Sequence, residues 1–198
     1  GGRGVGGSTL INSAICFKTP DTILEQWSGE LGCSRLTVEA MAPKLDRVWA
    51  TIGATINPPE VQRDNNRIFK KGADALGLPG QWLHRSAPGC IGCGVCHMGC
   101  PTGGESTVDR TFLAQALLGG HARVHADCRV EGVQTEGGKV MALTGRTIDP
   151  ETLSPAGRFT VRARAFVSCA GPIGSPRFLL RNGLSDDSVC GQRLYIHP

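Results

Sequence analysis

The sequence predicts an α/β fold in which packed helices are followed by an antiparallel β-meander. Three observations support this prediction. Apolar residues recur at helical spacing before residue 119, two glycines interrupt the chain at 119–120, and the period of apolar residues changes to two from residue 122. The chain has 198 residues, of which 40% are hydrophobic and 19% charged. That composition is typical of a globular protein with enough apolar surface for a core.

Three helices are expected in the first part of the chain. The first spans about 38–53, with Thr37 as its N-cap and apolar residues on one face. The second covers about 62–76 and ends before a glycine, which can adopt the left-handed conformation of a helix terminus. The third follows a cap at Ser106 or Thr107 and ends at the two glycines.

The second part of the chain predicts strands and one more helix. Glu136-Gly-Gly-Lys139 forms a hairpin turn between two of the strands. A short helix follows Ser175-Pro176 and covers 177–181, because proline suits the first turn of a helix. The strands are expected at 122–126, 130–135, 140–144, 158–163 and 165–169.

Four cysteines within eleven residues form the pattern C-x2-C-x2-C-x3-C-P. The candidate metal ligands are Cys90, Cys93, Cys96 and Cys100, and the spacing is that of a bacterial ferredoxin ligand run, which holds an iron–sulfur cluster. The chain has one such run rather than two, so a single cluster would use all four cysteines or recruit a distant one such as Cys128. Zinc, a disulfide, or a loop that packs without any ligand are the alternatives.

The chain opens with a second glycine-rich loop, Gly2-Arg-Gly-Val-Gly-Gly7. Its glycines match the dinucleotide fingerprint G-x-G-x-x-G, but that fingerprint requires a preceding strand, and none is visible in the sequence. Glycines nevertheless allow backbone N–H groups to approach a phosphate or a flat ring. A flexible turn without a ligand is the alternative.

Three stretches in order along the chain together resemble the glucose–methanol–choline (GMC) oxidoreductases, which depend on FAD. The run from Gly2 to Asn12 is similar to the first signature of that family, and the run from Gly171 to Leu179 resembles the second. The last stretch, Gly191 to Pro198, is similar to the residues that follow the second signature. The cysteine run followed by Gly103-Gly104 resembles the branch of the family that acts on long-chain or bulky alcohols.

The resemblance implies a set of residues that bind FAD. Val130 would meet the adenine through its backbone, and the alternative is an ordinary core residue of a strand. Asn12 is equally suited to a turn or a cap. Small residues at 170–171, at the end of a buried strand, would let the cofactor pass close to the backbone. The implied cofactor-binding residues are Gly6, Gly7, Ser8, Thr9, Asn12, Val130, Ala170 and Gly171.

The resemblance also implies the domain organisation. Residues 1–198 would be part of a Rossmann-like FAD-binding domain, with its first βαβ unit and the C-terminal substrate domain lying outside this chain. We expect an internal piece of a longer protein, since the chain opens within a glycine loop rather than with Met. The family's catalytic His would lie in the substrate domain. No catalytic residue is therefore expected here, and the five histidines are interpreted as surface or structural residues.

The implied function is oxidation of an alcohol, with hydride transfer from the substrate to the flavin and onward transfer to oxygen, a quinone or a cytochrome. An iron–sulfur electron-transfer protein is the alternative, and a non-catalytic module is a second one. The net charge of +4 is spread along the chain, which argues against nucleic-acid binding. No apolar run reaches membrane-spanning length. Closely spaced cysteines favour a reducing, cytoplasmic compartment.

Overall fold

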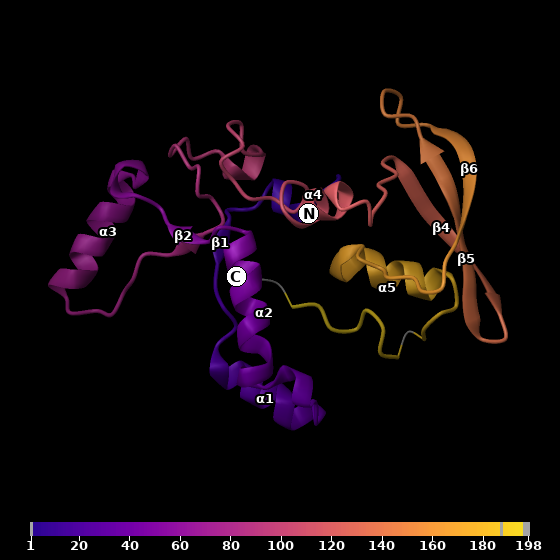
Figure 1. The fold of residues 1–198 in the computed structure, drawn as a ribbon, viewed down its shortest axis with the longest axis horizontal. Helices are drawn as coiled ribbons and strands as arrows, with labels where there is room; N and C mark the ends of the chain where they lie inside the picture. The colour runs from indigo at the N-terminus through magenta and orange to yellow at the C-terminus, as the bar shows by residue number, and fades with distance from the viewer. Residues whose placement is uncertain (1, 187, 196–198) are drawn as a thin grey trace. The chain divides into compact units, whose positions relative to one another are not determined.

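The structure is a computed structural model that describes residues 2–186 and 188–195. It divides into two compact units, Gly1–Val124 and His125–Pro198, which are described separately (Figure 1). The third stretch of family resemblance, from Gly191, falls partly on residues 196–198, which lie outside the described residues.

The first unit is mainly helical and contains one small antiparallel sheet. The order of that sheet is β1-β3-β2, and its central strand pairs on both sides, Arg85 lying opposite Ile15 and Thr55. The α-helices are α1 (Asp21–Leu31), α2 (Val38–Thr51), α3 (Asp64–Ala75) and α4 (Phe112–Leu118). Short 3-10 helices are η1 (Gly7–Leu10), η2 (Ser34–Leu36), η3 (Pro59–Val61) and η4 (Cys96–Met98), and the strands are β1 (Ile15–Cys16), β2 (Thr55–Ile56) and β3 (His84–Arg85).

Two of the predicted helices, α2 and α3, lie where the apolar spacing placed them. The hydroxyl of Thr37 accepts a hydrogen bond from the backbone N–H of Ala40 at 3.3 Å, which confirms it as the N-cap of α2. Helix α3 ends before Gly77, whose φ is +65°. Helix α1 was not predicted, although Leu24 lies at its buried face and Gly32 ends it in the left-handed conformation.

The predicted start of the third helix was wrong. Helix α4 begins at Phe112, and turns occupy residues 108–111. Ser106 donates its backbone N–H to the carbonyl of Ser86 at 2.7 Å, so this residue is tied to another segment rather than capping a helix. The hydroxyl of Thr107 is buried and has no hydrogen-bond partner among the described residues. Neither residue acts as a cap.

The second unit confirms the antiparallel meander. Strands β4 (Cys128–Glu136), β5 (Lys139–Ile148) and β6 (Pro155–Arg162) pair in the order β4-β5-β6. Both glycines of the predicted hairpin turn have positive φ, as that turn requires. In the central strand, a Cβ at Gly145 would lie 2.1 Å from the carbonyl oxygen of Arg129 and 2.6 Å from the ring of Phe159. Only glycine permits that close approach.

The strands predicted at 122–126 and 165–169 are absent from the described structure. Neither segment pairs with another strand, and Val167 is 86% exposed. A strand without a paired neighbour leaves its backbone donors and acceptors to water, so an apolar sequence alone does not produce one. Helix α5 (Gly171–Arg181) begins earlier than predicted, because Ser175 accepts a hydrogen bond from the backbone N–H of Ala170 at 3.1 Å.

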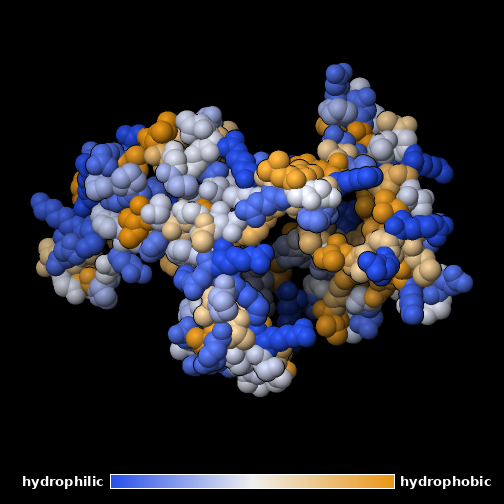
Figure 2. All heavy atoms as spheres, in the orientation of Figure 1, coloured by the Kyte–Doolittle hydropathy of each residue, from blue (hydrophilic) through white to orange (hydrophobic). Residues whose placement is uncertain are grey.

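The α/β composition is confirmed, and both sheets of the described residues contain antiparallel pairs. The Rossmann-like part of the prediction concerns parallel strands and stays a prediction. Few large side chains are buried, Leu24 among them, and hydrophobic residues lie on the surface of both units (Figure 2). None of the described helices combines the length and the apolar character that a membrane crossing requires.

Candidate functional site

The glycine loop is held in a fixed shape by its own backbone and by one threonine. Gly7 donates its N–H to the carbonyl of Gly4 at 3.0 Å, which closes a turn ahead of η1. Thr9 Oγ1 donates to the carbonyl of Gly6 at 2.6 Å and accepts from the N–H of Val108 at 3.0 Å. The loop is therefore tied to the segment before α4, and Thr9 has a structural role that the sequence did not indicate.

Two adjacent glycines of this loop differ in their surroundings. Both have positive φ, +106° at Gly6 and +61° at Gly7. A Cβ at Gly6 would lie 2.8 Å from Oδ1 of Asp109 and 3.2 Å from the side chain of Leu10, whereas a Cβ at Gly7 would meet no atom within 4 Å. The protein itself requires glycine at position 6. At position 7 it leaves the space above the backbone open to a ligand.

Asn12 and Ser8 are engaged locally. The side-chain oxygen of Asn12 accepts a hydrogen bond from the N–H of Ala14 at 2.6 Å. This bond stabilises the positive φ of Ala14, +58°, which is unusual for a residue other than glycine. Asn12 thus acts as a turn residue in this structure, and its amide N–H groups stay available to a ligand. Ser8 lies in η1, where its carbonyl accepts from Ile11 at 3.2 Å.

Buried acceptor atoms gather beside the glycine loop. Oε2 of Glu105, Oγ1 of Thr107 and Oδ1 of Asp109 have no hydrogen-bond partner among the described residues. Glu105 and Thr107 are only 4% and 5% exposed. A cavity of about 300 Å3, here called the acceptor pocket, is lined by these three residues together with Leu10, Ile11 and Arg110, among others. No sequence motif indicated this pocket.

The cysteine run forms a loop around an arginine rather than around a shared centre. Arg85 donates to Sγ of Cys96 at 3.0 Å and approaches Sγ of Cys90 at 3.8 Å. The same guanidinium donates twice to the carbonyl of Ser13, at 3.0 and 2.8 Å. Cys93 is exposed. Across residues 2–186 and 188–195, no group of three or more His, Cys, Asp or Glu side chains is arranged to hold a metal ion.

This geometry gives no support to an iron–sulfur cluster, which was one of several interpretations of the cysteine spacing. In a cluster site the four thiolates converge on one centre, but here a guanidinium takes up two of the sulfurs. Burial lowers the pKa of Arg85, while the hydrogen bond and charge of Cys96, and those of Cys90, raise it by more, so the net shift is upward. The cation between the sulfurs of this loop is therefore the guanidinium of Arg85.

Two further groups near this loop have shifted pKa values. Burial raises the pKa of the Cys100 thiol, but hydrogen bonds from the Thr102 hydroxyl and from the backbone of Glu105, Thr102 and Gly104 lower it by more. Burial raises the pKa of Glu105, and the charges of Arg85 and His97 oppose that shift only in part. The net result is a pKa below the ordinary value for the Cys100 thiol and a pKa above the ordinary value for the Glu105 carboxyl.

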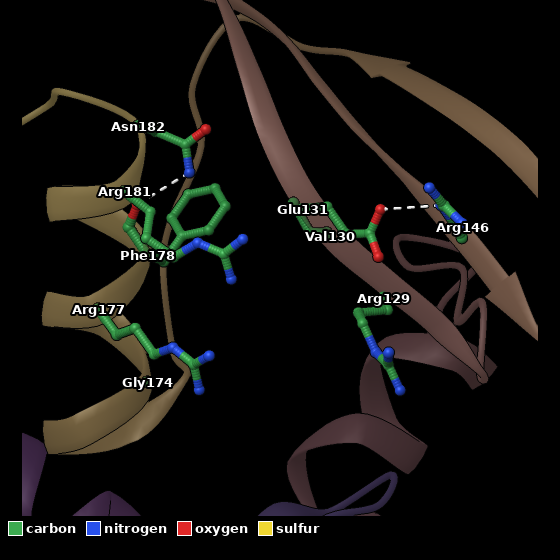
Figure 3. A pocket seen from close by; sticks show the side chains of 9 residues that line it. All are labelled: Arg129, Val130, Glu131, Arg146, Gly174, Arg177, Phe178, Arg181 and Asn182. Atoms are coloured by element: carbon green, nitrogen blue, oxygen red, sulfur yellow. Dashed lines mark hydrogen bonds and ion pairs between the residues drawn. The ribbon is translucent and has the colours of Figure 1, made fainter. Parts of the chain in front are cut away.

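The second unit contains a cavity of about 560 Å3 between α5 and β4, here called the arginine pocket (Figure 3). One acid, Glu131, forms an ion pair with Arg146 at 3.2 Å. Asn182 Oδ1 accepts a hydrogen bond from the N–H of Val133 at 3.2 Å and ties the end of α5 to β4. The pocket is lined by Arg129, Val130, Glu131, Arg146, Gly174, Arg177, Phe178, Arg181 and Asn182.

The chemistry of the arginine pocket favours an anion. Its four arginines face a single carboxylate, so three positive charges are not balanced within its lining. Guanidinium groups recognise phosphate and carboxylate oxygens in pairs. Val130 lies at this pocket and is 39% exposed, so it is not the buried core residue that was its alternative interpretation. In the sequence, the signal for this pocket is the spacing of Arg177 and Arg181, which lie four residues apart on α5.

The remaining predicted residues lie at the start of α5. Ala170 is the residue before the helix, and Gly171 opens it with φ +77°. A Cβ at Gly171 would meet no atom within 4 Å. The prediction that these residues close a buried strand was wrong, because 165–169 forms no strand. The lack of a side chain at Gly171 is therefore not explained by packing against the described residues.

Comparison with known proteins covers the whole chain. A family model described as GMC oxidoreductase matches residues 1–198. An uncharacterized GMC-type oxidoreductase of Mycobacterium tuberculosis is 32% identical over 197 residues, which are 100% of this chain and 30% of that protein. An uncharacterized GMC-type oxidoreductase of Sinorhizobium fredii is 30% identical over 197 residues, 100% of this chain and 38% of that protein.

A long-chain-alcohol oxidase of Arabidopsis thaliana is 28% identical over 204 residues, which are 100% of this chain and 27% of the oxidase. The chain thus spans between 27% and 38% of the length of these three relatives.

Proposed function

The chain belongs to the GMC oxidoreductase family, and we propose that it forms part of the FAD-binding domain of an enzyme that oxidises alcohols. The match of the family model to residues 1–198 supports the oxidoreductase class. The long-chain-alcohol oxidases of Arabidopsis thaliana among its relatives support a long-chain or bulky alcohol as the substrate. When bound, FAD supplies the acceptor for the hydride of the alcohol.

The observation that carries this proposal is the shape of the glycine loop at Gly7. The loop is closed by its own hydrogen bonds, yet the position of a Cβ at Gly7 meets no atom within 4 Å. Gly171 repeats this combination of positive φ and open space at the start of α5. Such bare backbone is what a flat ring or a phosphate requires for close approach. The residues present therefore fit FAD, and in this proposal they position it.

The arginine pocket supports a role for the second unit in binding the cofactor. We place the adenine at the backbone of Val130, and we assign nearby arginines, such as Arg129 and Arg177, to its phosphate-bearing half. Three unbalanced positive charges at this pocket suit a diphosphate. This chain would thus contribute Gly6, Gly7, Ser8, Thr9, Asn12, Val130, Ala170 and Gly171 to cofactor binding.

The rest of the proposal concerns parts of the enzyme beyond these residues. Residues 1–198 would belong to a Rossmann-like FAD-binding domain whose first βαβ unit and substrate domain lie outside the chain, together with the catalytic base. The electron acceptor is proposed to be oxygen, a quinone or a cytochrome, and the compartment a reducing one. Anaerobic reduction of the flavin by a long-chain alcohol, followed by addition of each acceptor in turn, tests the substrate and the acceptor.

The substitution Gly7→Asn in the complete protein tests the cofactor site. Asparagine tolerates positive φ better than most residues, and no described protein atom lies within 4 Å of the new Cβ. We therefore expect the melting temperature of the FAD-free protein to stay unchanged. The dissociation constant of FAD should rise by at least about tenfold, because 1.4 kcal/mol of lost binding energy suffices for that change.

The matched control is Gly77→Asn, at the end of α3. Gly77 has φ +65° and also has no atom within 4 Å of its Cβ position, but it lies outside the proposed site. This variant should retain its full content of FAD. If Gly7→Asn binds FAD as tightly as Gly77→Asn does, the glycine loop does not face the cofactor and the proposal is wrong.

A further inference from the structure

The acceptor pocket contains three buried side-chain oxygens that no donor of the described residues reaches. Oε2 of Glu105, Oγ1 of Thr107 and Oδ1 of Asp109 are buried without partners among the residues that the structure describes. Arg110 is the basic residue of the lining, yet it forms no ion pair with either carboxylate in the described part of the chain. Buried acceptors of this kind are normally satisfied. The pocket therefore calls for a ligand that donates hydrogen bonds.

The backbone that carries these acceptors is fixed before any ligand binds. Ser106 donates to the carbonyl of Ser86 at 2.7 Å, and Val108 donates to Thr9 Oγ1 at 3.0 Å. The carbonyl of Thr107 accepts from the N–H of Arg110 at 3.1 Å and from the hydroxyl of Thr111 at 2.8 Å. The unpaired oxygens are thus held in place by their neighbours, and a ligand would find them preorganised.

The pocket adjoins the glycine loop. A Cβ at Gly6 would lie 2.8 Å from Oδ1 of Asp109, so this carboxylate oxygen lies against the bare backbone of that glycine. Leu10 and Ile11, which follow in the same loop, form an apolar part of the lining. A ligand that contacts the glycine loop can therefore reach the acceptors of residues 105–109.

We propose that the acceptor pocket binds the uncharged half of FAD, the flavin ring and its ribityl chain, through Glu105, Thr107 and Asp109. The inference rests on the proposed function, because it takes FAD as the ligand of the glycine loop. The ring offers an N–H donor and the ribityl chain offers hydroxyl donors, and both lie beside apolar ring surface. Phosphate groups bring negative charge and accept rather than donate, so two carboxyl groups disfavour them.

Other ligands fit the pocket less well. A simple alcohol substrate has one hydroxyl donor, whereas the pocket offers three unpaired acceptors. A metal ion would need more ligands than the two carboxyls and one hydroxyl, and no cluster in the described part of the chain is arranged for one. Polyhydroxyl and N–H donors on a partly apolar molecule match both features of the lining.

Binding of three probes to the complete protein, freed of its cofactor, tests this inference. The probes are FAD, riboflavin, which lacks the phosphates and the adenine, and AMP, which lacks the flavin. The variants Glu105→Gln and Thr107→Val remove one acceptor each at nearly constant volume. Each should raise the dissociation constants of FAD and riboflavin by about tenfold, since a lost hydrogen bond to a buried acceptor is of that size. The affinity for AMP should stay within about twofold of wild type.

The control is Glu60→Gln, an exposed carboxylate of η3 that should change none of the three affinities. The melting temperatures of the cofactor-free variants should not fall, because Thr107→Val removes an unsatisfied polar atom and Glu105→Gln replaces a buried carboxyl with an uncharged amide. If FAD binds to wild type and both variants bind riboflavin as wild type does, the inference is wrong while the proposed function stands. It is also wrong if AMP weakens as much as riboflavin, or if Mn2+ binds to wild type and is lost in Glu105→Gln with riboflavin unchanged. Failure of wild type to bind any flavin overturns both.

Discussion

The glycine loop at residues 2–12 and the cysteine loop at residues 90–100 belong to the same unit and are both rich in glycine, but a charged side chain holds only the second. The glycine loop closes through its own groups, as in the hydrogen bonds from Gly7 to Gly4 and from Thr9 to Gly6. The cysteine loop is held from outside by Arg85, whose guanidinium contacts two of its sulfurs and the carbonyl of Ser13. Both loops leave bare backbone open, at Gly7 and at Gly94, but only the cysteine loop surrounds a side chain from another segment of the protein.

This difference shows what spacing along a sequence does and does not determine. The cysteine spacing is the more specific pattern in isolation, yet convergence of four thiolates depends on the backbone path between them, and a nearby cation can attract the sulfurs instead. The glycine pattern is weak by itself, because glycines occur in many turns. It became specific because two other stretches, from Gly171 and from Gly191, resemble the GMC family in the same order along the chain. The structure adds the open space at Gly7.

The largest effect is expected from Gly6→Val, which tests how the glycine loop is built. A branched side chain at φ +106° is strained, and its Cβ would meet the carboxylate of Asp109 and the side chain of Leu10. Backbone strain and overpacking together should lower the free energy of unfolding by about 2–6 kcal/mol. Chemical denaturation of the cofactor-free protein measures this loss. Flavin retention should be lost as well, since the loop can no longer keep its shape.

The pair Gly6→Ala and Gly6→Ala/Asp109→Ala separates the two causes. Removal of the Asp109 carboxylate relieves the contact at 2.8 Å but leaves the strained φ. The double variant should therefore recover part of the stability lost by the single one. Equal stability of the two would show that Asp109 does not restrict this position, and the strained φ and the contact with Leu10 would then explain the glycine.

Much of the fold could be predicted because local sequence decides it. The apolar spacing and the Thr37 cap define α2, and two consecutive glycines define the hairpin between β4 and β5. The errors arose where the structure of a segment depends on its contacts with other segments. Residues 165–169 read as a buried strand, but a strand forms only beside another one, and the described residues provide no neighbour for it. The two-residue strands β1–β3 carry too few residues for any period to show.

For the same reason, the sequence indicates the glycines of the candidate site but not its two pockets. The family resemblance points to the glycines at positions 6, 7 and 171, and each of them has a positive φ, which glycine adopts without strain. The acceptor pocket could not be predicted, because Glu105 and Thr107 become unusual only when tertiary packing buries them without partners. In the sequence they look like a surface acid and a helix cap. The arginine pocket likewise depends on α5 lying beside β4.

A smaller effect is expected from Arg85→Met, which removes the cation from the cysteine loop but keeps most of the side chain's length. The carbonyl of Ser13 would lose two donors and the sulfur of Cys96 one. We expect the free energy of unfolding to fall by about 1–3 kcal/mol, the cost of leaving such groups unpaired. Cys93→Ser is the control, since Cys93 is exposed, and it should change neither stability nor flavin content. If wild type contains iron and Cys93→Ser does not, the cysteine loop binds an iron–sulfur cluster after all.

The smallest effect concerns the titration of Cys100 and requires no change in fold. The Thr102 hydroxyl, 3.6 Å from the sulfur, and neighbouring backbone N–H groups hold the pKa of this thiol below its ordinary value. The stability that this provides is present above the unfolded-state pKa and is lost as the pH falls through the folded-state pKa. Alkylation of Cys100 by iodoacetamide, followed by peptide mass spectrometry, should therefore reach half its maximal rate at a lower pH in the folded than in the denatured protein. In Thr102→Val that pH should move upward, because one donor to the thiolate is gone. Identical alkylation profiles for wild type and Thr102→Val would show that the hydroxyl does not stabilise the thiolate, and that the backbone of the loop alone sets its pKa.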